Sequence, residues 1–157
     1  MRLVLYQPDI PQNTGSILRL AACLGVPVDL IEPAGFVITD KGLRRAGLDY
    51  LPAATLTRHD SFAAFEAWRR QAGGRLVLVT TRAAMPYTEF AYRPGDLLML
   101  GRESAGVPDA VHDLAEARVV IPMVAGMRSV NVAVAAGMIL GEALRQTGGF
   151  PAAGPAE

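Results

Sequence analysis

The sequence predicts an α/β fold in which a mainly parallel sheet carries helices on both faces. Short apolar runs, such as residues 2–7 and 75–80, alternate with segments of helical periodicity from one end of the chain to the other. Runs of this kind are typical of strands that are buried on both faces. Repeated strand–helix units of this size connect parallel strands and cover both sides of the sheet.

Capping and stop signals delimit the elements. Residues 2–7 form the first expected strand, and the helix over 14–24 that follows it stops at Gly25. Ser61 caps a later helix that ends at Gly73. The other expected strands are residues 26–31, 75–80, 96–100 and 119–121. The other expected helices are a short basic one over 40–46, a short one beginning at Pro108, and a long one over 130–146 that stops at Gly148.

Length and composition fit one ordinary domain. The chain has 157 residues, of which 51% are hydrophobic and 19% charged, and this balance excludes a disordered chain. We expect a single domain over residues 1–148 and a disordered tail over 149–157. No apolar run approaches the roughly 20 residues of a membrane helix, and no signal peptide precedes the first strand, so we expect a cytoplasmic protein without a membrane partner.

The expected helix over 130–146 has almost no polar face. Its apolar residues include Val130, Val132, Ala133, Val134, Ala135, Ala136, Met138, Ile139 and Leu140. A helix that is apolar all round is buried on every side, and in a chain this short a second protein is a source of that cover. We therefore expect a homodimer.

Several familiar sites are missing from the sequence. Residues 101–106 (GRESAG) have the glycine spacing of a phosphate loop but lack the Lys and Ser/Thr that follow it. The dinucleotide fingerprint and the nucleophile elbow are absent. Cys23, the single cysteine, is interpreted as a buried core residue, and no Cys/His cluster has zinc spacing. His59 and His112 stand alone and are interpreted as surface or capping residues.

Three polar segments remain, and each follows an expected strand, where sheets of this class place their sites. They are residues 11–19 with Asn13 in a turn and Arg19 on the helix behind it, residues 98–108 with Arg102, Glu103 and Ser104, and residues 121–137 with Arg128, Ser129 and Asn131. Taken singly, Asn13 and Ser129 are explained as helix caps, and Glu103 and Arg19 as solvated charges. Their concentration at neighbouring loop ends indicates one site.

These segments resemble the three motifs of the SPOUT-class RNA ribose 2′-O-methyltransferases. The motifs are the N-x5-R of Asn13 and Arg19, the LGRESAGVP turn, and the IPM…RSVN stretch that leads into the last helix. The resemblance covers nearly the whole chain. Residues 6–19 (YQPDIPQNTGSILR), 31–36 (IEPAGF) and 44–50 (RRAGLDY) are similar to the tRNA (cytidine(34)-2′-O)-methyltransferase subfamily.

The resemblance implies a reaction, a cofactor and a topology. A methyl group passes from S-adenosylmethionine, leaving S-adenosylhomocysteine, to the ribose 2′-hydroxyl of the wobble nucleotide (position 34, cytidine or modified uridine) in the tRNA anticodon stem-loop. The fold contains a C-terminal deep trefoil knot, and no metal is needed because the sulfonium already activates its methyl. Gly101 lets backbone approach the cofactor. The positions that match the cofactor site are Val79, Thr80, Gly101, Ile121, Met123 and Ser129.

The resemblance also assigns catalytic and RNA-binding residues. The catalytic set is Arg19, Asn13, Glu103, Ser129 and Asn131, and the RNA-binding set is Lys41, Arg44, Arg45 and Arg128. A guanidinium has a pKa above ~12, which favours an electrostatic role for Arg19 and leaves proton abstraction open. The chain has no net charge, with 15 basic and 15 acidic residues, so it does not hold nucleic acid by bulk charge. Residues 41–58 carry a net charge of +3, either as a local RNA contact or as a solvated face.

Two other functions remain open. One is a 2′-O-methyltransferase that acts on another tRNA or rRNA ribose, which nucleotide mapping would distinguish. The other is a flavodoxin-like module that binds a small ligand without catalysis. That module explains the α/β pattern but not the three polar segments, and binding of S-adenosylmethionine would argue against it.

Overall fold

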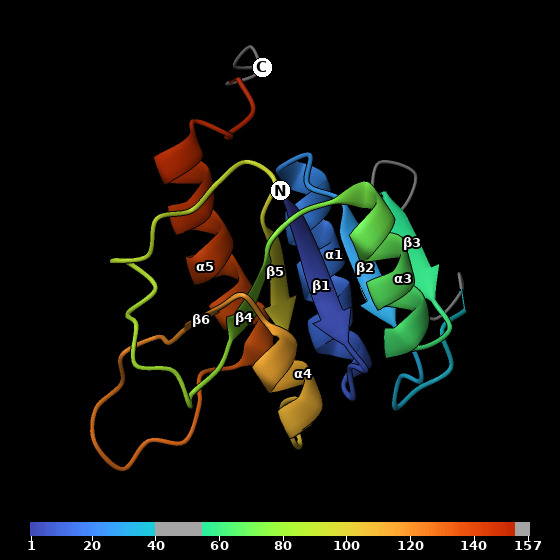
Figure 1. Ribbon diagram of the computed structural model, residues 1–157. Coiled ribbons are helices and arrows are strands. Elements are labelled where there is room, and N and C mark those ends of the chain that lie inside the picture. Colours follow the sequence, from blue (N-terminus) through green and yellow to red (C-terminus); the bar gives the residue numbers. More distant parts are fainter. Residues whose placement is uncertain (40–54, 153–157) are drawn as a thin grey trace.

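The computed structural model describes residues 1–39 and 55–152 and contains one parallel sheet (Figure 1). The elements in chain order are β1 (Arg2–Tyr6), α1 (Pro11–Cys23), β2 (Val28–Ile31), β3 (Leu56–His59), α3 (Phe62–Ala72), β4 (Leu76–Val79), β5 (Leu97–Leu100), α4 (Asp109–Leu114), β6 (Ala117–Val119) and α5 (Val132–Thr147). The strand order is β3-β2-β1-β5-β4-β6, and every pairing is parallel. The predicted parallel sheet is confirmed.

Helices cover both faces of the sheet, as the sequence predicted. Leu3 and Leu5 of β1 point to one face, where they share a core with α1 and α5. Val4 and Tyr6 point to the other face and pack with residues of α3 and α4. Figure 1 shows α3 and α4 in front of the sheet and α1 behind it. Because both faces are covered, every residue of β5 is buried, which explains its uninterrupted apolar sequence.

Most of the residues that were predicted to begin or end helices do so. The side chain of Ser61 accepts a hydrogen bond from the Ala64 N–H at 3.1 Å at the start of α3. Gly25, one residue beyond the C-cap of α1, and Gly148, the C-cap of α5, adopt φ values of +66° and +63°, in the left-handed region that glycine tolerates best. Pro108 is the residue before α4 instead of its first residue.

Several predicted boundaries are wrong. Helix α1 begins at Pro11, not at residue 14, because proline suits the first position of a helix. Strand β6 begins at Ala117, two residues before the predicted start at 119, and α5 begins at Val132, two residues after the predicted start at 130. Strand β3 was not predicted at all, since its sequence LTRH lacks an apolar run. The predicted basic helix over 40–46 lies outside the described residues.

Two single-residue interpretations are also wrong. Cys23 is exposed, because it is the last residue of α1. His59 is buried instead of lying at the surface or in a cap, and its Nε2 lies 2.8 Å from Oδ1 of the buried Asp29. The rings of Phe65 and Trp68 enclose the His59 imidazole, each with its centroid 5.3 Å away.

Helix α5 is not buried on every side within one chain. Its inner residues pack in the core, but Val134 is 53% and Met138 is 36% exposed. The segment between β4 and β5 passes along this helix. Its beginning bridges to the strand end after β6 through Pro86 and Val120, and its end holds α5 through Gln146, whose side chain accepts from the Tyr92 N–H. Among the described residues, no helix is long and apolar enough to span a membrane.

Candidate active site

A cavity of about 680 Å³ opens at the carboxyl ends of β4, β5 and β6. The cavity lies beside the neighbouring strands β1 and β5. The helix that follows β1, α1, covers one face of the sheet, and the helix that follows β5, α4, covers the other face. In open α/β sheets, such a switch in connection direction is where ligands bind. The predicted site residues that line the cavity are Asn13, Val79, Thr80, Gly101, Glu103, Ile121, Met123, Arg128, Ser129 and Asn131.

Asn13 connects the three polar segments. It lies in the first turn of α1, not in the turn before the helix as predicted. Its Nδ2 donates to Oε1 of Glu103 at 3.2 Å, and its Oδ1 accepts from Nδ2 of Asn131 at 3.1 Å. A single amide therefore joins the start of α1, the loop after β5 and the start of α5.

Asn131 is the N-cap of α5. Its Oδ1 accepts from the backbone N–H groups of Ala133 and Val134, at 2.8 and 3.3 Å. Ser129, the residue that helix capping explains at the sequence level, lies two residues before the cap and lines the cavity instead. Because the Asn131 oxygen is used by the helix, its amide nitrogen remains to donate to Asn13.

The loop after β5 is a closed turn. Arg102 N–H donates to the Gly106 carbonyl at 3.0 Å, and Gly106 N–H donates to the Arg102 carbonyl at 2.9 Å. A Cβ on Gly101 would lie 2.7 Å from the carbonyl carbon of Gly106, a distance that side chains do not tolerate. The close approach that Gly101 permits is therefore between two backbone segments, and it places Glu103 at the tip of a tight turn.

Asp9 is a member of the site that the sequence analysis missed. Its Oδ1 accepts from Nη2 of Arg102 at 2.6 Å, and its Oδ2 accepts from the Ser104 N–H at 3.0 Å and from the Ser104 hydroxyl. The hydrogen bonds from Arg102 and then Ser104 lower the pKa of Asp9 to about 2. An acidic residue in the conspicuous loop QPDIPQN was the available signal, but nothing near it in sequence shows its partners.

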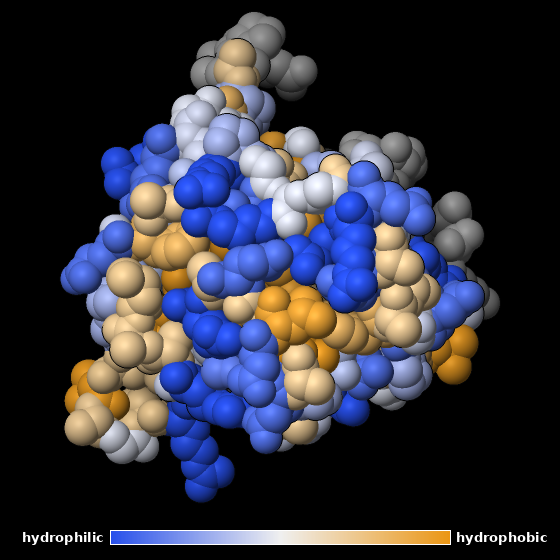
Figure 2. Space-filling model, viewed as in Figure 1, coloured by the Kyte–Doolittle hydropathy of each residue, from blue (hydrophilic) through white to orange (hydrophobic). Residues whose placement is uncertain are grey.

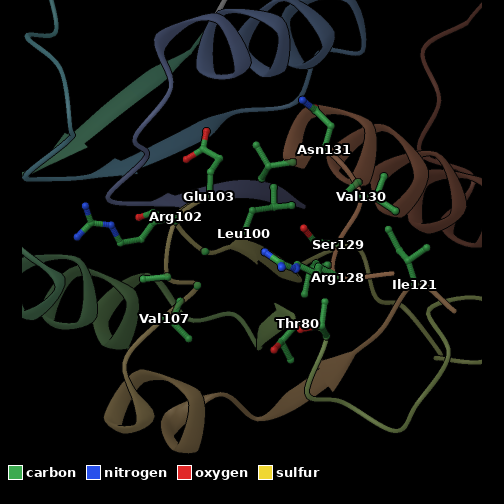
Figure 3. A pocket seen from close by; sticks show the side chains of 18 of the residues that line it. Thr80, Leu100, Arg102, Glu103, Val107, Ile121, Arg128, Ser129, Val130 and Asn131 are labelled. Carbon is green, nitrogen blue, oxygen red and sulfur yellow. The ribbon is translucent and has the colours of Figure 1, made fainter. Parts of the chain in front are cut away.

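The other wall of the cavity is largely apolar. Leu78 and Leu100 come from the strand ends, and Ile121 and Val130 come from the segment between β6 and α5. Figure 3 shows Glu103 and Asn131 on one side of the space and Thr80 on the opposite side, with Arg128 and Ser129 between them. Apolar walls with a few converging polar groups suit an organic ligand that has a flat apolar part and a polar edge.

Among the residues that the structure describes, one predicted site residue is not brought into this cavity. Arg19 lies on the exposed side of α1 and does not line the cavity. At 3.6 residues per turn, it is displaced by about 120° around the helix from Asn13. Lys41, Arg44 and Arg45 lie outside the described residues. Within residues 1–39 and 55–152, no group of three or more His, Cys, Asp or Glu could hold a metal ion.

Comparisons with known proteins agree on one family. The model of the SpoU rRNA Methylase family matches residues 1–141. A tRNA (cytidine(34)-2′-O)-methyltransferase from Beijerinckia indica is 64% identical over 93% of this chain and 91% of its own length. The protein of the same name from Escherichia coli K12 is 44% identical over 98% of this chain and 97% of its own length.

Solved structures show the same fold. A structure described as giving insight into the 2-OH methylation of C/U34 on tRNA superposes with a TM-score of 0.87, at 46% identity over 92% of this chain and 94% of that one. The SpoU methyltransferase AviRb from Streptomyces viridochromogenes, in complex with the cofactor AdoMet, has a TM-score of 0.82 at 32% identity; the match covers 93% of this chain and 57% of AviRb. With its family model, near-full-length relatives and fold in agreement, this chain belongs to the SpoU methylase family.

Proposed function

We propose that this protein transfers a methyl group from S-adenosylmethionine to the ribose 2′-hydroxyl of the wobble nucleotide, position 34, of tRNA. The tRNA (cytidine(34)-2′-O)-methyltransferases of Beijerinckia indica and Escherichia coli K12 are 64% and 44% identical to it over nearly their full length. The observation that carries the proposal is the junction at Asn13. It joins all three motif segments at the edge of one cavity, as a site that holds both a cofactor and a reacting hydroxyl requires.

The volume and lining of the cavity support S-adenosylmethionine as the cofactor. The cavity volume of about 680 Å³ is that of a pocket for a drug-sized molecule. Val79, Thr80, Gly101, Ile121 and Met123 would hold the adenosine part through backbone groups and apolar contacts. When bound, the cofactor supplies a methyl group that its sulfonium already activates. AviRb, 32% identical, was solved with this cofactor bound.

The residues around the cavity would position the RNA and lower the cost of charging the ribose hydroxyl. Arg128 reaches into the cavity (Figure 3) and would bind a phosphate or the developing alkoxide. Both carboxylate oxygens of Glu103 already accept hydrogen bonds, from Asn13 and from the Asp9 N–H, so we assign Glu103 to holding the loops. Arg19, on the outer side of α1, would contact the RNA through its guanidinium and would not act as a base.

We also propose a homodimer with a knotted C-terminal part. Val134 and Met138 present exposed apolar surface on α5, and Val124 and Met127 do so at the loop before it, whose apolar tip is visible in Figure 2. The segment of residues 80–96 passes along α5, and this passage supports the knot. The segment pairs with the residue after β6 through Pro86 and Val120, and further along it the Phe90 carbonyl accepts a hydrogen bond from Gln146 of α5 at 3.0 Å.

Mapping of 2′-O-methyl groups in tRNA tests the proposed function. The purified protein is incubated with labelled S-adenosylmethionine and total RNA from a strain that lacks the gene, and the labelled nucleotide is located by digestion. Label at position 34 is the expected result. Label at another tRNA or rRNA ribose would favour the alternative substrate, and calorimetry that detects no cofactor binding would favour the non-catalytic module.

A further inference from the structure

Asp9 joins two of the loops that border the candidate site. It lies in the loop between β1 and α1, and its partners Arg102, Glu103 and Ser104 lie more than 90 positions later in the chain. Its carboxylate accepts from Arg102 and Ser104, while its own N–H donates to Oε2 of Glu103 at 2.8 Å. One residue therefore contacts three consecutive positions of the loop after β5.

These contacts tie the loop to the rest of the protein. The paired hydrogen bonds between Arg102 and Gly106 close the turn on itself but do not fix its tilt against the sheet. Asp9 supplies that link from the neighbouring strand end, on the side of the turn that faces β1. If the turn tilted, the carboxylate of Glu103 would leave Asn13, because their hydrogen bond is already 3.2 Å long.

The backbone around Asp9 packs against the loop after β2. The Gly35 N–H donates to the Pro8 carbonyl at 2.8 Å, and a Cβ on Gly35 would lie 3.1 Å from the Cα of Asp9. The loop after β2 thus backs the loop after β1. Because the backbone of Asp9 is held in place, its side chain can hold the turn of residues 102–106 in one position.

The negative charge of Asp9 matters for this arrangement. The guanidinium of Arg102 and the donors of Ser104 hold the pKa of Asp9 at about 2, so the carboxylate is ionised at every pH at which tRNA is handled. An asparagine at position 9 would have nearly the same shape. Its NH₂ group would face donors of Arg102 or Ser104, and at least one of the present hydrogen bonds would be lost.

We propose that Asp9 is a positioning residue for methyl transfer: it sets the loop after β5 so that Glu103 meets Asn13. The inference rests on the proposed function, because it assigns Asp9 a part in that reaction. Asp9 acts through Glu103 and the turn and not on the reacting atoms. Its removal therefore lowers the turnover rate more than it weakens binding of the cofactor.

A double-mutant cycle in kcat tests this inference. With saturating S-adenosylmethionine and tRNA, Asp9→Asn is expected to lower kcat about 10- to 100-fold, the scale of a misplaced catalytic loop. In a Glu103→Gln background the same change is expected to cost less than about threefold, because the group that Asp9 positions is already altered. The control is Asp60→Asn, which changes an exposed carboxylate that does not line the cavity and should leave kcat within about twofold. Equal losses in both backgrounds, or full activity of Asp9→Asn, would overturn the proposal.

Hydrogen exchange provides a readout that does not depend on activity. Asp9→Asn is expected to speed amide exchange in the peptide covering residues 101–107 while exchange in β1 and β2 stays as in the wild type. Unchanged exchange in 101–107 would overturn the anchoring role. If the wild type does not methylate position 34 while the variant still shows faster exchange, the proposed function fails and the anchoring contact stands.

Discussion

Asn13 and Asn131, 118 positions apart in the chain, are joined by a hydrogen bond of 3.1 Å from Nδ2 of Asn131 to Oδ1 of Asn13. The bond ties the beginning of the first helix to the beginning of the last. Each asparagine also makes a second contact, because Asn13 holds Glu103 and Asn131 caps α5. The geometry of the site therefore depends on side-chain amides that use both their donor and their acceptor atoms.

Asn13→Ala should remove the junction of the three motif loops. We expect kcat/KM for tRNA to fall about 100- to 1000-fold, the effect of losing a preorganised polar contact in an active site. The exposed neighbour provides the control, since Gln12→Ala changes a side chain that does not line the cavity. Initial-rate kinetics on both variants decides the matter. Similar rates for the two would show that the junction has no role in catalysis.

Asn131→Asp should separate stability from activity. The new carboxylate still accepts from the first N–H groups of α5, so the free energy of unfolding should change by less than about 1 kcal/mol. It cannot donate to Asn13, so activity should fall at least tenfold. Asn131→Ala should lose both, with about 1 kcal/mol of stability from the missing cap. Urea denaturation and methylation assays on the pair give the comparison, and an equally active Asp variant would contradict it.

Gly101→Ala should disrupt the cofactor cavity, because its methyl group would lie 2.7 Å from the backbone of Gly106. We expect at least tenfold weaker binding of S-adenosylmethionine by calorimetry and a loss of about 1–3 kcal/mol in stability from overpacking. Gly95→Ala is the matched control, since nothing lies within 4 Å of a Cβ there. Equal affinities of the two variants would contradict the steric argument.

Acid should weaken the anchoring by Asp9 in a defined pH range. Its pKa of about 2 in the folded protein lies below the ordinary value of 3.8, so its contribution to stability is complete above about pH 5. That contribution is lost as the pH falls from about 4 towards 2. The difference in free energy of unfolding between the wild type and Asp9→Asn should therefore be constant near neutrality and shrink below pH 4. Urea denaturation at a series of pH values measures it, and a difference that grew on acidification would have the wrong sign.

Met138→Glu should dissociate the proposed dimer, because it places a charge on the exposed apolar side of α5. Ala67→Glu, on the exposed side of α3, is the control. We expect analytical ultracentrifugation to find the first variant monomeric, and the wild type and control dimeric. A wild type that sediments as a monomer at micromolar concentration would contradict the proposed dimer.

Local signals in the sequence predicted most of the framework. Apolar runs marked the buried strands, and Ser61, Gly25 and Gly148 marked helix ends because capping and left-handed backbone are properties of single residues. Strand β3 was not predicted because three of its four side chains are polar. One of them, His59, is buried because it contacts Asp29, 30 positions away. That compensation is invisible along the chain.

The loops that form the site were predicted, but the hydrogen bonds between their side chains were not. The motif segments identified the loops that line the cavity, since strand ends of a parallel sheet meet at one edge. The start of α1 at Pro11 then decided which side chains face inward, and it turned Asn13 towards Glu103 and Arg19 away from the cavity. Asp9 was missed because a loop carboxylate has the same local appearance whether water or Arg102 surrounds it.

The central claim, that the 2′-hydroxyl of nucleotide 34 receives the methyl group, is tested most directly with two synthetic anticodon stem-loops. One carries cytidine at position 34 and the other carries 2′-deoxycytidine there, with all other positions identical. The purified protein and labelled S-adenosylmethionine should transfer label to the first RNA and none to the second. Equal labelling of both RNAs would place the methyl group elsewhere and contradict the account.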